Sequence, residues 1–471
     1  MSPSSPNIVF IMSDDHASHA ISAYGSTINQ TPHLDRLADG GVRFDNAFCT
    51  NSICTPSRAS ILTGTYNHVN GVTTLATPFD TRQPSFPGLL AEQGYQTALF
   101  GKWHLGHGGL HDPRGFDEWA VFPDQGDYHD PEMIHPDGRR VHRGYATDIV
   151  TDMSLDWLER RDPARPFCLL VHHKAPHRPW EPDAAHADMY TDVDIPEPPT
   201  LRDDYSGRSE AAAAATMRID RDLKPDDLKE PVPEGLSADE ELSWRYQRYI
   251  KDYLRCVASI DDNVGRLLDR LDAAGLSDDT LVVYTSDQGF FLGDHGWYDK
   301  RFMYEESLRM PLLMRYPRVI QPGSSCDAMV LNVDFAQTFL DLARVPELPT
   351  MQGRSLTPLL QGNVPDDWRT SMYYRYWMHD DFFHHVRAHY GVRTHRYKLI
   401  HYYGEGFGLP GNTDRTFEPE WELFDLEHDP MELNSVHDDP AYASVRRDLE
   451  RELDRLQREV GDQPAASLTV S

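Results

Sequence analysis

The stretch Cys54–Gly64, with the sequence CTPSRASILTG, places a potential nucleophile at the start of a predicted helix. Pro56 suits a first helical turn because its φ is fixed and its missing N–H is not needed there, and Thr55 and Ser57 are candidate caps. A helix N-terminus attracts anions, and the forked guanidinium of Arg58 could bind a tetrahedral oxyanion. The alternative is a capped helix with a buried cysteine and a surface arginine.

Acidic and amide side chains follow two predicted buried strands. The apolar runs 7–12 and 280–285 are typical of strands that are buried on both faces of a parallel sheet, and such sheets place their sites at the carboxyl ends of the strands. Adjacent carboxylates repel each other, so a divalent cation between them would explain their presence. For the first pair, the alternative is a helix N-cap with an acidic first turn. The candidate metal ligands are Asp14, Asp15, Asp287 and Gln288.

Lysine and histidine residues follow two further strands. Lys102 and His104 come after a short predicted strand, and in an extended segment they would face the same way. Such a pair could bind an anionic oxygen and transfer a proton. The alternative is a solvated lysine and a packed histidine. After the predicted strand 167–171, we expect packing and supporting roles for His172 and His173.

The stretch Cys54–Gly64 resembles the signature of the type I sulfatases. In that family the cysteine is oxidised to formylglycine, whose hydrated form is the nucleophile. Most relatives carry Asn or His where this chain has Gln288, although the amide oxygen of glutamine can still bind a cation. Together with the first stretch, four others match elements of the family in the family's order: Asn7–Asp15, Gly101–Gly106, Ala175–Pro179 and Ser286–Gly289.

The resemblance implies roles for individual residues. One divalent cation, Ca²⁺ by analogy, would be held by the four candidate ligands and by the modified Cys54. The family mechanism is attack on sulfur, release of the alcohol, and collapse of the sulfated diol to the aldehyde. His104 is the candidate base for the collapse, and His177 or His295 is the candidate acid for the leaving alcohol. Asp294 and His295 are candidates for holding the rest of the substrate. The residues implied to bind the sulfate group are Arg58, Lys102, His177 and Lys300.

The segment Phe302–Ser307 resembles the carbohydrate sulfatases that act on N-acetylglucosamine-6-sulfate. We therefore expect an enzyme that removes sulfate from a small sulfated saccharide, after maturation by a formylglycine-generating enzyme. A phosphonate or phosphate ester hydrolase with the same nucleophile is one alternative. Another is a non-catalytic, metal-containing glycan-binding protein in which Cys54 stays a thiol, although a binding protein would not need the whole set of lysine and histidine residues.

The composition of the 471 residues narrows the function further. A net charge of −30 argues against a general binder of nucleic acid or of anionic membranes, and it means that an anionic substrate needs a local cluster of cations. The first apolar run, 8–12, is too short to span a membrane. No signal peptide is recognised at the start, and the five cysteines are scattered. We therefore expect a cytoplasmic protein.

The resemblance and the strand pattern together predict an α/β fold. We expect an alkaline-phosphatase-like, mixed but mostly parallel sheet flanked by helices in residues 1–365, followed by a C-terminal α+β subdomain with a small antiparallel sheet in residues 366–471. Residues 106–145 are predicted to form a long surface loop, and the residues from 462 onward are predicted to be frayed. The predicted main helices are 31–38, 85–92, 145–160, 243–274, 332–342 and 441–460.

Overall fold

A ten-stranded mixed sheet forms the centre of the computed structural model, which describes residues 5–463. Its strands are β1 (Asn7–Ser13), β2 (Val42–Phe44), β4 (Gln96–Gly101), β5 (Glu118–Val121), β6 (Glu132–His135), β7 (Gly138–Val141), β8 (Phe167–His172), β9 (Thr280–Ser286), β12 (Leu312–Arg315) and β13 (Ser324–Cys326). Their order is β13-β2-β12-β9-β1-β8-β4-β5-β6-β7. The block β9-β1-β8-β4-β5 is entirely parallel, which confirms the predicted fold class.

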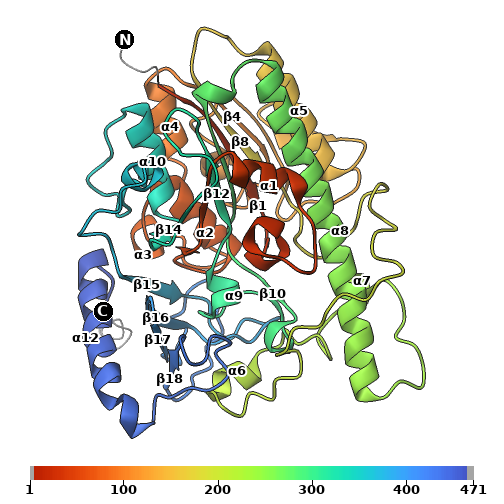
Figure 1. Ribbon diagram of the computed structural model, residues 1–471, viewed down its shortest axis with the longest axis vertical. Helices are drawn as coiled ribbons and strands as arrows, with labels where there is room; N and C mark the ends of the chain where they lie inside the picture. The colour runs from red at the N-terminus through yellow and green to blue at the C-terminus, as the bar shows by residue number, and fades with distance from the viewer. Residues whose placement is uncertain (1–4, 464–471) are drawn as a thin grey trace.

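Helices cover both faces of this sheet (Figure 1). On one face α1 (Pro32–Asp39), α5 (Ala146–Arg160) and α8 (Ala238–Ala273) pack together, and on the other face α2 (Cys54–Thr63), α4 (Phe86–Glu92) and α10 (Asp334–Ala343) do so. α8 begins before the predicted residue 243 because Ser237 caps it: the N–H of Glu240 donates to Ser237 Oγ at 3.3 Å, and the Glu240 carboxylate accepts from the Ser237 N–H at 2.8 Å.

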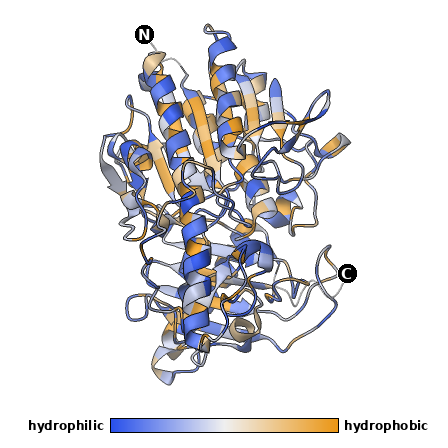
Figure 2. Ribbon diagram, turned by 90° about the vertical axis from the view of Figure 1, so that its right-hand side faces the viewer, coloured by the Kyte–Doolittle hydropathy of each residue, from blue (hydrophilic) through white to orange (hydrophobic). Residues whose placement is uncertain are grey.

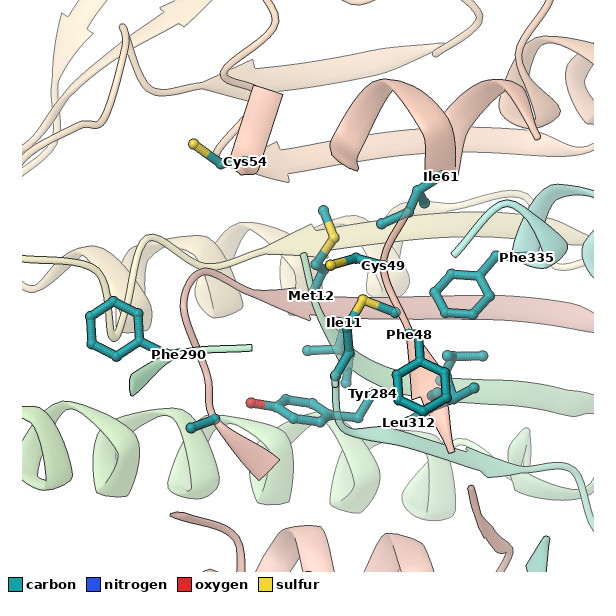
Figure 3. Close-up of a cluster of buried hydrophobic side chains, with 14 of the residues drawn as sticks. Ile11, Met12, Phe48, Cys49, Cys54, Ile61, Tyr284, Phe290, Leu312 and Phe335 are labelled. Carbon is teal, nitrogen blue, oxygen red and sulfur yellow. The ribbon is translucent and has the colours of Figure 1, made fainter. Parts of the chain in front are cut away.

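The core lies between the sheet and its helices, where the strands are mostly hydrophobic (Figure 2). Residues 8–11 of β1 are completely buried, as expected for a central strand covered on both faces. Figure 3 shows part of this core around Ile11, Phe48 and Tyr284. Cys54 lies at the edge of the group, and its sulfur points away from the other labelled side chains.

A four-stranded antiparallel sheet forms the C-terminal part of the protein. It contains β15 (Ser371–Tyr376), β16 (His389–Thr394), β17 (Tyr397–Tyr402) and β18 (Glu420–Asp425), and α12 (Ala443–Val460) packs against it. The small sheet is as predicted, and the division at residue 365 stays a prediction. Asp462 is not frayed, because its carboxylate accepts from Tyr373 Oη at 2.6 Å and from Arg375 Nη1 at 2.9 Å. The rest of the predicted frayed tail, from 464 onward, lies outside the described residues.

Residues 106–145 are not a plain loop, and that prediction is wrong. They contribute β5, β6 and β7 to one end of the sheet. β6 and β7 are short antiparallel strands, β6 lies between β5 and the edge strand β7, and β7 is exposed along its length, so the segment shows no long apolar run. None of the helices within residues 5–463 is long and apolar enough to span a membrane. The shorter elements are β3 (Ala47–Phe48), β10 (Phe291–Leu292), β11 (Tyr298–Asp299), β14 (Val330–Leu331), α3 (Asn67–Asn70), α6 (Glu210–Ala214), α7 (Pro225–Leu228), α9 (Glu305–Leu308) and α11 (Thr357–Leu360).

Candidate active site

The acidic residues meet at the carboxyl ends of the central strands. β1 and β9 are parallel neighbours, with Ser13 opposite Ser286, so the residues that follow them leave the sheet side by side. The N–H of Asp15 donates to Asp287 Oδ1 at 3.3 Å. The four predicted metal ligands are therefore brought together, and each is at most 1% exposed: Asp14, Asp15, Asp287 and Gln288.

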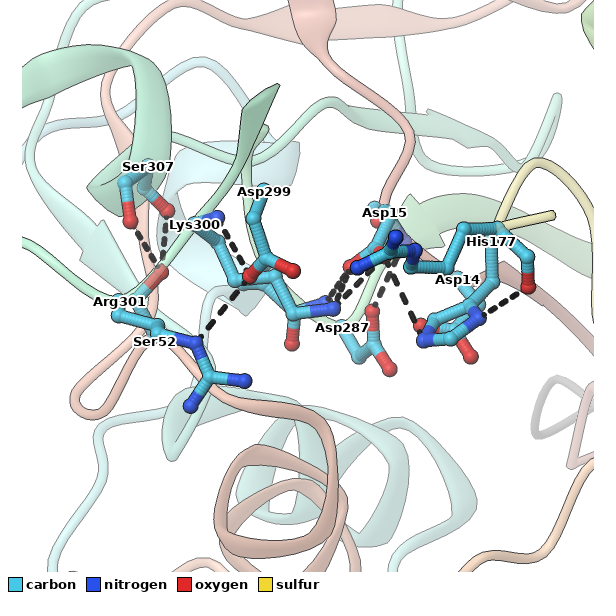
Figure 4. A network of polar contacts seen from close by, with 12 residues as sticks. Asp14, Asp15, Ser52, His177, Asp287, Asp299, Lys300, Arg301 and Ser307 are labelled. Carbon is cyan, nitrogen blue, oxygen red and sulfur yellow. Dashed lines mark hydrogen bonds and ion pairs between the residues drawn. The ribbon is translucent and has the colours of Figure 1, made fainter. Parts of the chain in front are cut away.

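Two buried lysines pair with the first two carboxylates. Lys300 Nζ lies 2.6 Å from Asp15 Oδ1, and Lys102 Nζ contacts Asp14 Oδ2. Figure 4 shows Lys300 directed toward Asp15. Burial raises the pKa of Asp15 to about 6, although the Lys300 ammonium opposes the shift. For Lys300, burial lowers the pKa, but the Asp15 carboxylate outweighs it and the pKa rises above its ordinary value. Asp15 thus has a compensating cation in a region that excludes water, whereas burial lowers the pKa of Lys102, the partner of Asp14, well below its ordinary value.

Arg58 holds α2 against the strand ends. Its Nε donates to Asp287 Oδ2 at 2.9 Å, and its Nη1 donates to the carbonyl of Lys102 at 2.8 Å. The side chain is buried, so the alternative of a surface arginine is wrong. Two fixed hydrogen bonds leave the guanidinium little rotational freedom, which suits a group that must meet an anion in one orientation.

Cys54 is the first residue of α2, and Gly64 ends the helix in the left-handed region with φ 65°. The predicted capping by Thr55 and Ser57 is wrong, because both lie inside the helix. Thr55 Oγ1 donates to the carbonyl of His104 at 2.9 Å, and Ser57 Oγ donates to the carbonyl of Asp287. The helix start is therefore tied to the strand ends on two sides.

The unmodified thiol of Cys54 is unfavourably placed to act as a nucleophile. Burial raises the pKa of Cys54 to about 11. A thiol with this pKa is protonated at neutral pH, and it is the thiolate that acts as a nucleophile. An unmodified Cys54 is therefore a poor nucleophile in this position, whereas its place at the helix start beside the acidic cluster suits an oxygen nucleophile.

His104 is joined to Lys102 by Gln125. Lys102 Nζ can only donate, and it donates to Gln125 Oε1, so the amide nitrogen of Gln125 faces His104 Nε2 at 3.2 Å. His104 Nε2 must then be the unprotonated nitrogen. Burial, followed by the charge of Lys102, lowers the pKa of His104 well below its ordinary value. The prediction that an extended backbone makes Lys102 and His104 face the same way is wrong. Both residues follow β4, and His104 has φ 55°, which is not an extended conformation.

His177 lies on the other side of Asp15. Its Nδ1 donates to the carbonyl of Arg178 at 2.8 Å, so its Nε2 carries the free electron pair and faces Asp15 Oδ2 at 3.8 Å. His172 donates from Nδ1 to the carbonyl of Lys102 at 3.2 Å, which is a supporting contact of the expected kind. The segment 172–177 therefore places His177 in the site, whereas His172 supports the backbone at Lys102.

The structure does not join Asp294 and His295 to this group of residues. Asp294 Oδ2 faces His19 Nε2 at 3.3 Å, and His295 is fully buried, with Nδ1 3.0 Å from Asp203 Oδ2 and 2.9 Å from Arg208 Nη1. Burial lowers the pKa of His295 to about 3. These contacts indicate a structural role, and a role in substrate binding stays a prediction without a contact to support it.

The acidic residues fit a bound cation. Asp14 Oδ1 and Gln288 Oε1 are buried acceptors without a hydrogen-bond partner among the described residues. Ligand atoms of Asp14, Asp15 and His177 lie within 4.8 Å of one another. Carboxylate and amide oxygens suit Ca²⁺ or Mg²⁺. The predicted ligand set is therefore chemically consistent, and the identity of the cation stays a prediction.

Sequence reasoning missed several residues beside the site. Gln125 lies in the segment predicted as a loop and shows no motif. Asp299 and Arg301 flank Lys300 and are buried, and Arg301 Nε donates to Asp299 Oδ1 at 3.3 Å (Figure 4). Lys174 is also buried, with its Nζ 4.7 Å from the centroid of the Tyr128 ring. The sequence signal for Asp299, Arg301 and Lys174 is that they lie close in the chain to recognised site residues. Such closeness does not by itself separate site residues from their neighbours.

Comparison with known protein families places this site in context. The Sulfatase family matches residues 6–345, and the family N-sulphoglucosamine sulphohydrolase, C-terminal, matches residues 293–459. The N-acetylglucosamine-6-O-sulfatase of Bacteroides thetaiotaomicron is 42% identical over 97% of this chain and 87% of its own length. The human N-acetylglucosamine-6-sulfatase is 28% identical over 79% of this chain and 67% of its own length.

Solved structures show the same fold. A protein solved in complex with its substrate D-glucosamine-2-N,6-O-disulfate superposes with a TM-score of 0.91 and is 42% identical, covering 97% of this chain and 98% of that chain. The phosphonate monoester hydrolase of Agrobacterium radiobacter has a TM-score of 0.75 at 23% identity, covering 98% of this chain and 97% of that one. The second similarity concerns the fold alone.

Proposed function

This chain belongs to the sulfatase family, and we propose that it removes a 6-O-sulfate from N-acetylglucosamine or a closely related glucosamine saccharide. The choice of substrate is supported by the similarity to the N-acetylglucosamine-6-O-sulfatase. The observation that most directly supports sulfate binding is the convergence of a set of basic residues on the acidic cluster beside the start of α2: Arg58, Lys102, His177 and Lys300. That convergence supplies the local positive charge that a sulfate needs in a chain of net charge −30.

The proposed nucleophile is formylglycine made from Cys54 by a formylglycine-generating enzyme. Once hydrated, this group would supply an oxygen nucleophile that needs no thiolate. The high pKa of the Cys54 thiol supports the proposal, since the unmodified residue would be almost entirely protonated. A divalent cation, Ca²⁺ by analogy, would be held by Asp14, Asp15, Asp287 and Gln288 and would supply charge neutralisation and activation of the nucleophile.

Side chains of the protein would bind the sulfate group and would act as the acid and the base. Arg58, Lys102 and Lys300 would bind sulfate oxygens and stabilise charge that develops during S–O cleavage. His177 is the better candidate for the acid that protonates the leaving alcohol, because its Nε2 faces the cluster whereas His295 is enclosed by Asp203 and Arg208. In that role His177 would act as the imidazolium, with a proton on Nε2 as well as on the Nδ1 that donates to Arg178. His104 remains the candidate base for sulfate release, with Nε2 as its basic nitrogen.

The test is sulfate release from N-acetylglucosamine-6-sulfate, measured by ion chromatography with the enzyme matured alongside a formylglycine-generating enzyme. We expect turnover by the wild type and none above background by Cys54→Ala. Cys326→Ala is the matched control, because it removes another buried cysteine, on β13, and it should keep activity.

Two other outcomes would point to the alternatives. Faster hydrolysis of a phosphonate monoester than of any sulfate ester would favour the phosphonate hydrolase. Saccharide binding by the matured protein without turnover would favour a glycan-binding protein. A cytoplasmic location also stays a prediction, which cell fractionation with an antibody against the protein would test.

A further inference from the structure

Two neighbouring phenylalanine rings are unusually exposed. Phe382 is 81% exposed and Phe383 is 61% exposed, and no other large hydrophobic side chain within residues 5–463 is exposed as much. Their ring centroids lie 5.3 Å apart with the ring planes at 90°. Leaving two aromatic rings in water forfeits hydrophobic free energy, and exposed apolar groups of this kind often mark a binding surface.

The backbone that carries the rings is fixed by hydrogen bonds. Asp381 Oδ1 accepts from the N–H groups of Phe383 and His384 at 3.1 and 3.2 Å. On the other side of the chain, Thr216 donates its N–H to the carbonyl of His384 at 2.8 Å and its hydroxyl to the carbonyl of Phe383 at 2.7 Å. The rings are therefore presented by an ordered segment, which lowers the entropy cost of binding.

One chain of contacts leads from the rings to Lys300. His384, the residue after Phe383, places Nε2 3.3 Å from Asp299 Oδ2. The backbone N–H of Lys300 donates to Asp299 Oδ1 at 2.8 Å. The exposed rings are thus anchored to the segment that carries one of the proposed sulfate-binding residues.

A second chain of contacts leads to His177. The ammonium of Lys224 lies 4.8 Å from the centroid of the Phe383 ring, and the Lys224 N–H donates to Asp227 Oδ2 at 2.8 Å. The Asp227 carboxylate pairs with Arg178, which directly follows His177. Because His177 and Lys300 both face Asp15, the two chains of contacts connect the segment that carries the rings to two residues of the candidate active site.

We propose that Phe382, Phe383 and Lys224 form a second sugar subsite at the rim of the active site, for the ring linked to the sulfated sugar. The inference rests on the proposed function. The C–H face of a pyranose ring is apolar and matches an aromatic platform, while Lys224 gives the subsite a positive charge that suits a carboxylate or sulfate on that second sugar. The enzyme would therefore prefer a disaccharide to a single sulfated sugar.

The test compares two substrates. One is N-acetylglucosamine-6-sulfate, and the other is a disaccharide with the same sulfated sugar at its non-reducing end and a uronic acid next to it. For Phe382→Ala/Phe383→Ala we expect the disaccharide kcat/KM to fall about ten-fold through KM, with less than about a two-fold change for the monosaccharide. Phe382→Tyr/Phe383→Tyr should restore the preference because it keeps both rings, and Val364→Ala is the control at another exposed apolar residue.

Several results would overturn the subsite. An equal loss on both substrates would mean that the rings support the fold or the chemistry instead of a second sugar. No change on either substrate would also overturn it, as would a shift from dimer to monomer in the alanine variant, which would make the rings an interface between copies. If the wild type hydrolyses neither substrate, the proposed function itself fails and this inference fails with it.

Discussion

The ion pair between Lys300 and Asp15 offers a quantitative test of the site. Both side chains are at most 3% exposed and their charged atoms lie 2.6 Å apart. Removing one partner of a buried pair leaves the other uncompensated and typically costs about 3–5 kcal/mol. We therefore expect Lys300→Met to lower the free energy of unfolding by about 3–5 kcal/mol in EDTA, and to lower kcat by about 10²–10³-fold if Lys300 binds the sulfate.

The pH dependence of this loss has a definite sign. Burial already raises the pKa of Asp15 to about 6 with Lys300 present, and removing the lysine raises it further. When the pKa of a carboxyl group is higher in the folded than in the unfolded protein, the folded protein loses stability as the pH rises through the folded pKa. The destabilisation of Lys300→Met should therefore be larger at pH 8 than at pH 5, where Asp15 is largely protonated.

The assay is urea unfolding followed by circular dichroism, together with sulfate release. The double variant Lys300→Met/Asp15→Asn removes both charges, so it should recover most of the stability but none of the activity. Lys251→Met is the control, because Lys251 faces the exposed Asp194 at 3.8 Å and should cost less than about 1 kcal/mol. If the double variant is as unstable as the sum of its single variants, the argument from the buried pair is wrong.

Three further predictions concern residues around this pair. Arg58→Lys should lower kcat by about 10²–10³-fold, since lysine cannot make both hydrogen bonds of the guanidinium; an unchanged kcat would contradict that role. Gln125→Glu should lower kcat by about 10²-fold or more, because a carboxylate would draw the His104 proton to Nε2, whereas the exposed Gln93→Glu should not. Burial lowers the pKa of Lys174 from 10.5 to about 8, so Lys174→Met should be more stable than the wild type at pH 7 by up to about 3 kcal/mol. The extra stability of Lys174→Met over the wild type should shrink as the pH rises from 8 to 10.5. Urea unfolding at both ends of this range measures it, and an equal difference in the free energy of unfolding at the two pH values would contradict the prediction.

Much of the catalytic sheet could be predicted because its strands are buried on both faces. β1, β8 and β9 are continuous apolar runs, and the polar residues at their ends mark the site. Parallel pairing then brings those ends together without any information beyond the sequence.

Other features depend on contacts that leave no local pattern. β6 and β7 have only four residues each and β7 is fully exposed, and Gln125 is recognisable only once Lys102 and His104 are seen beside it. Asp294 and His295 are near Lys300 in the chain but turn away from it, with φ 100° at Gly293 and 57° at His295. Nearness in sequence therefore does not by itself bring these two side chains into contact with Lys300.

The C-terminal region shows the same limit. Its short strands could be predicted, but the anchoring of Asp462 by Tyr373 and Arg375 joins residues almost ninety positions apart. Such pairs form because both partners are buried together, and nothing in the local sequence of a chain terminus reveals its distant partner.

Mass spectrometry of the tryptic peptide Phe44–Arg58 tests directly whether formylglycine is the nucleophile. The enzyme is matured alongside a formylglycine-generating enzyme, and sulfate release is assayed on the same sample. We expect formylglycine at position 54 and activity that rises in proportion to the modified fraction. Full activity in a sample whose Cys54 is entirely unmodified would contradict this expectation.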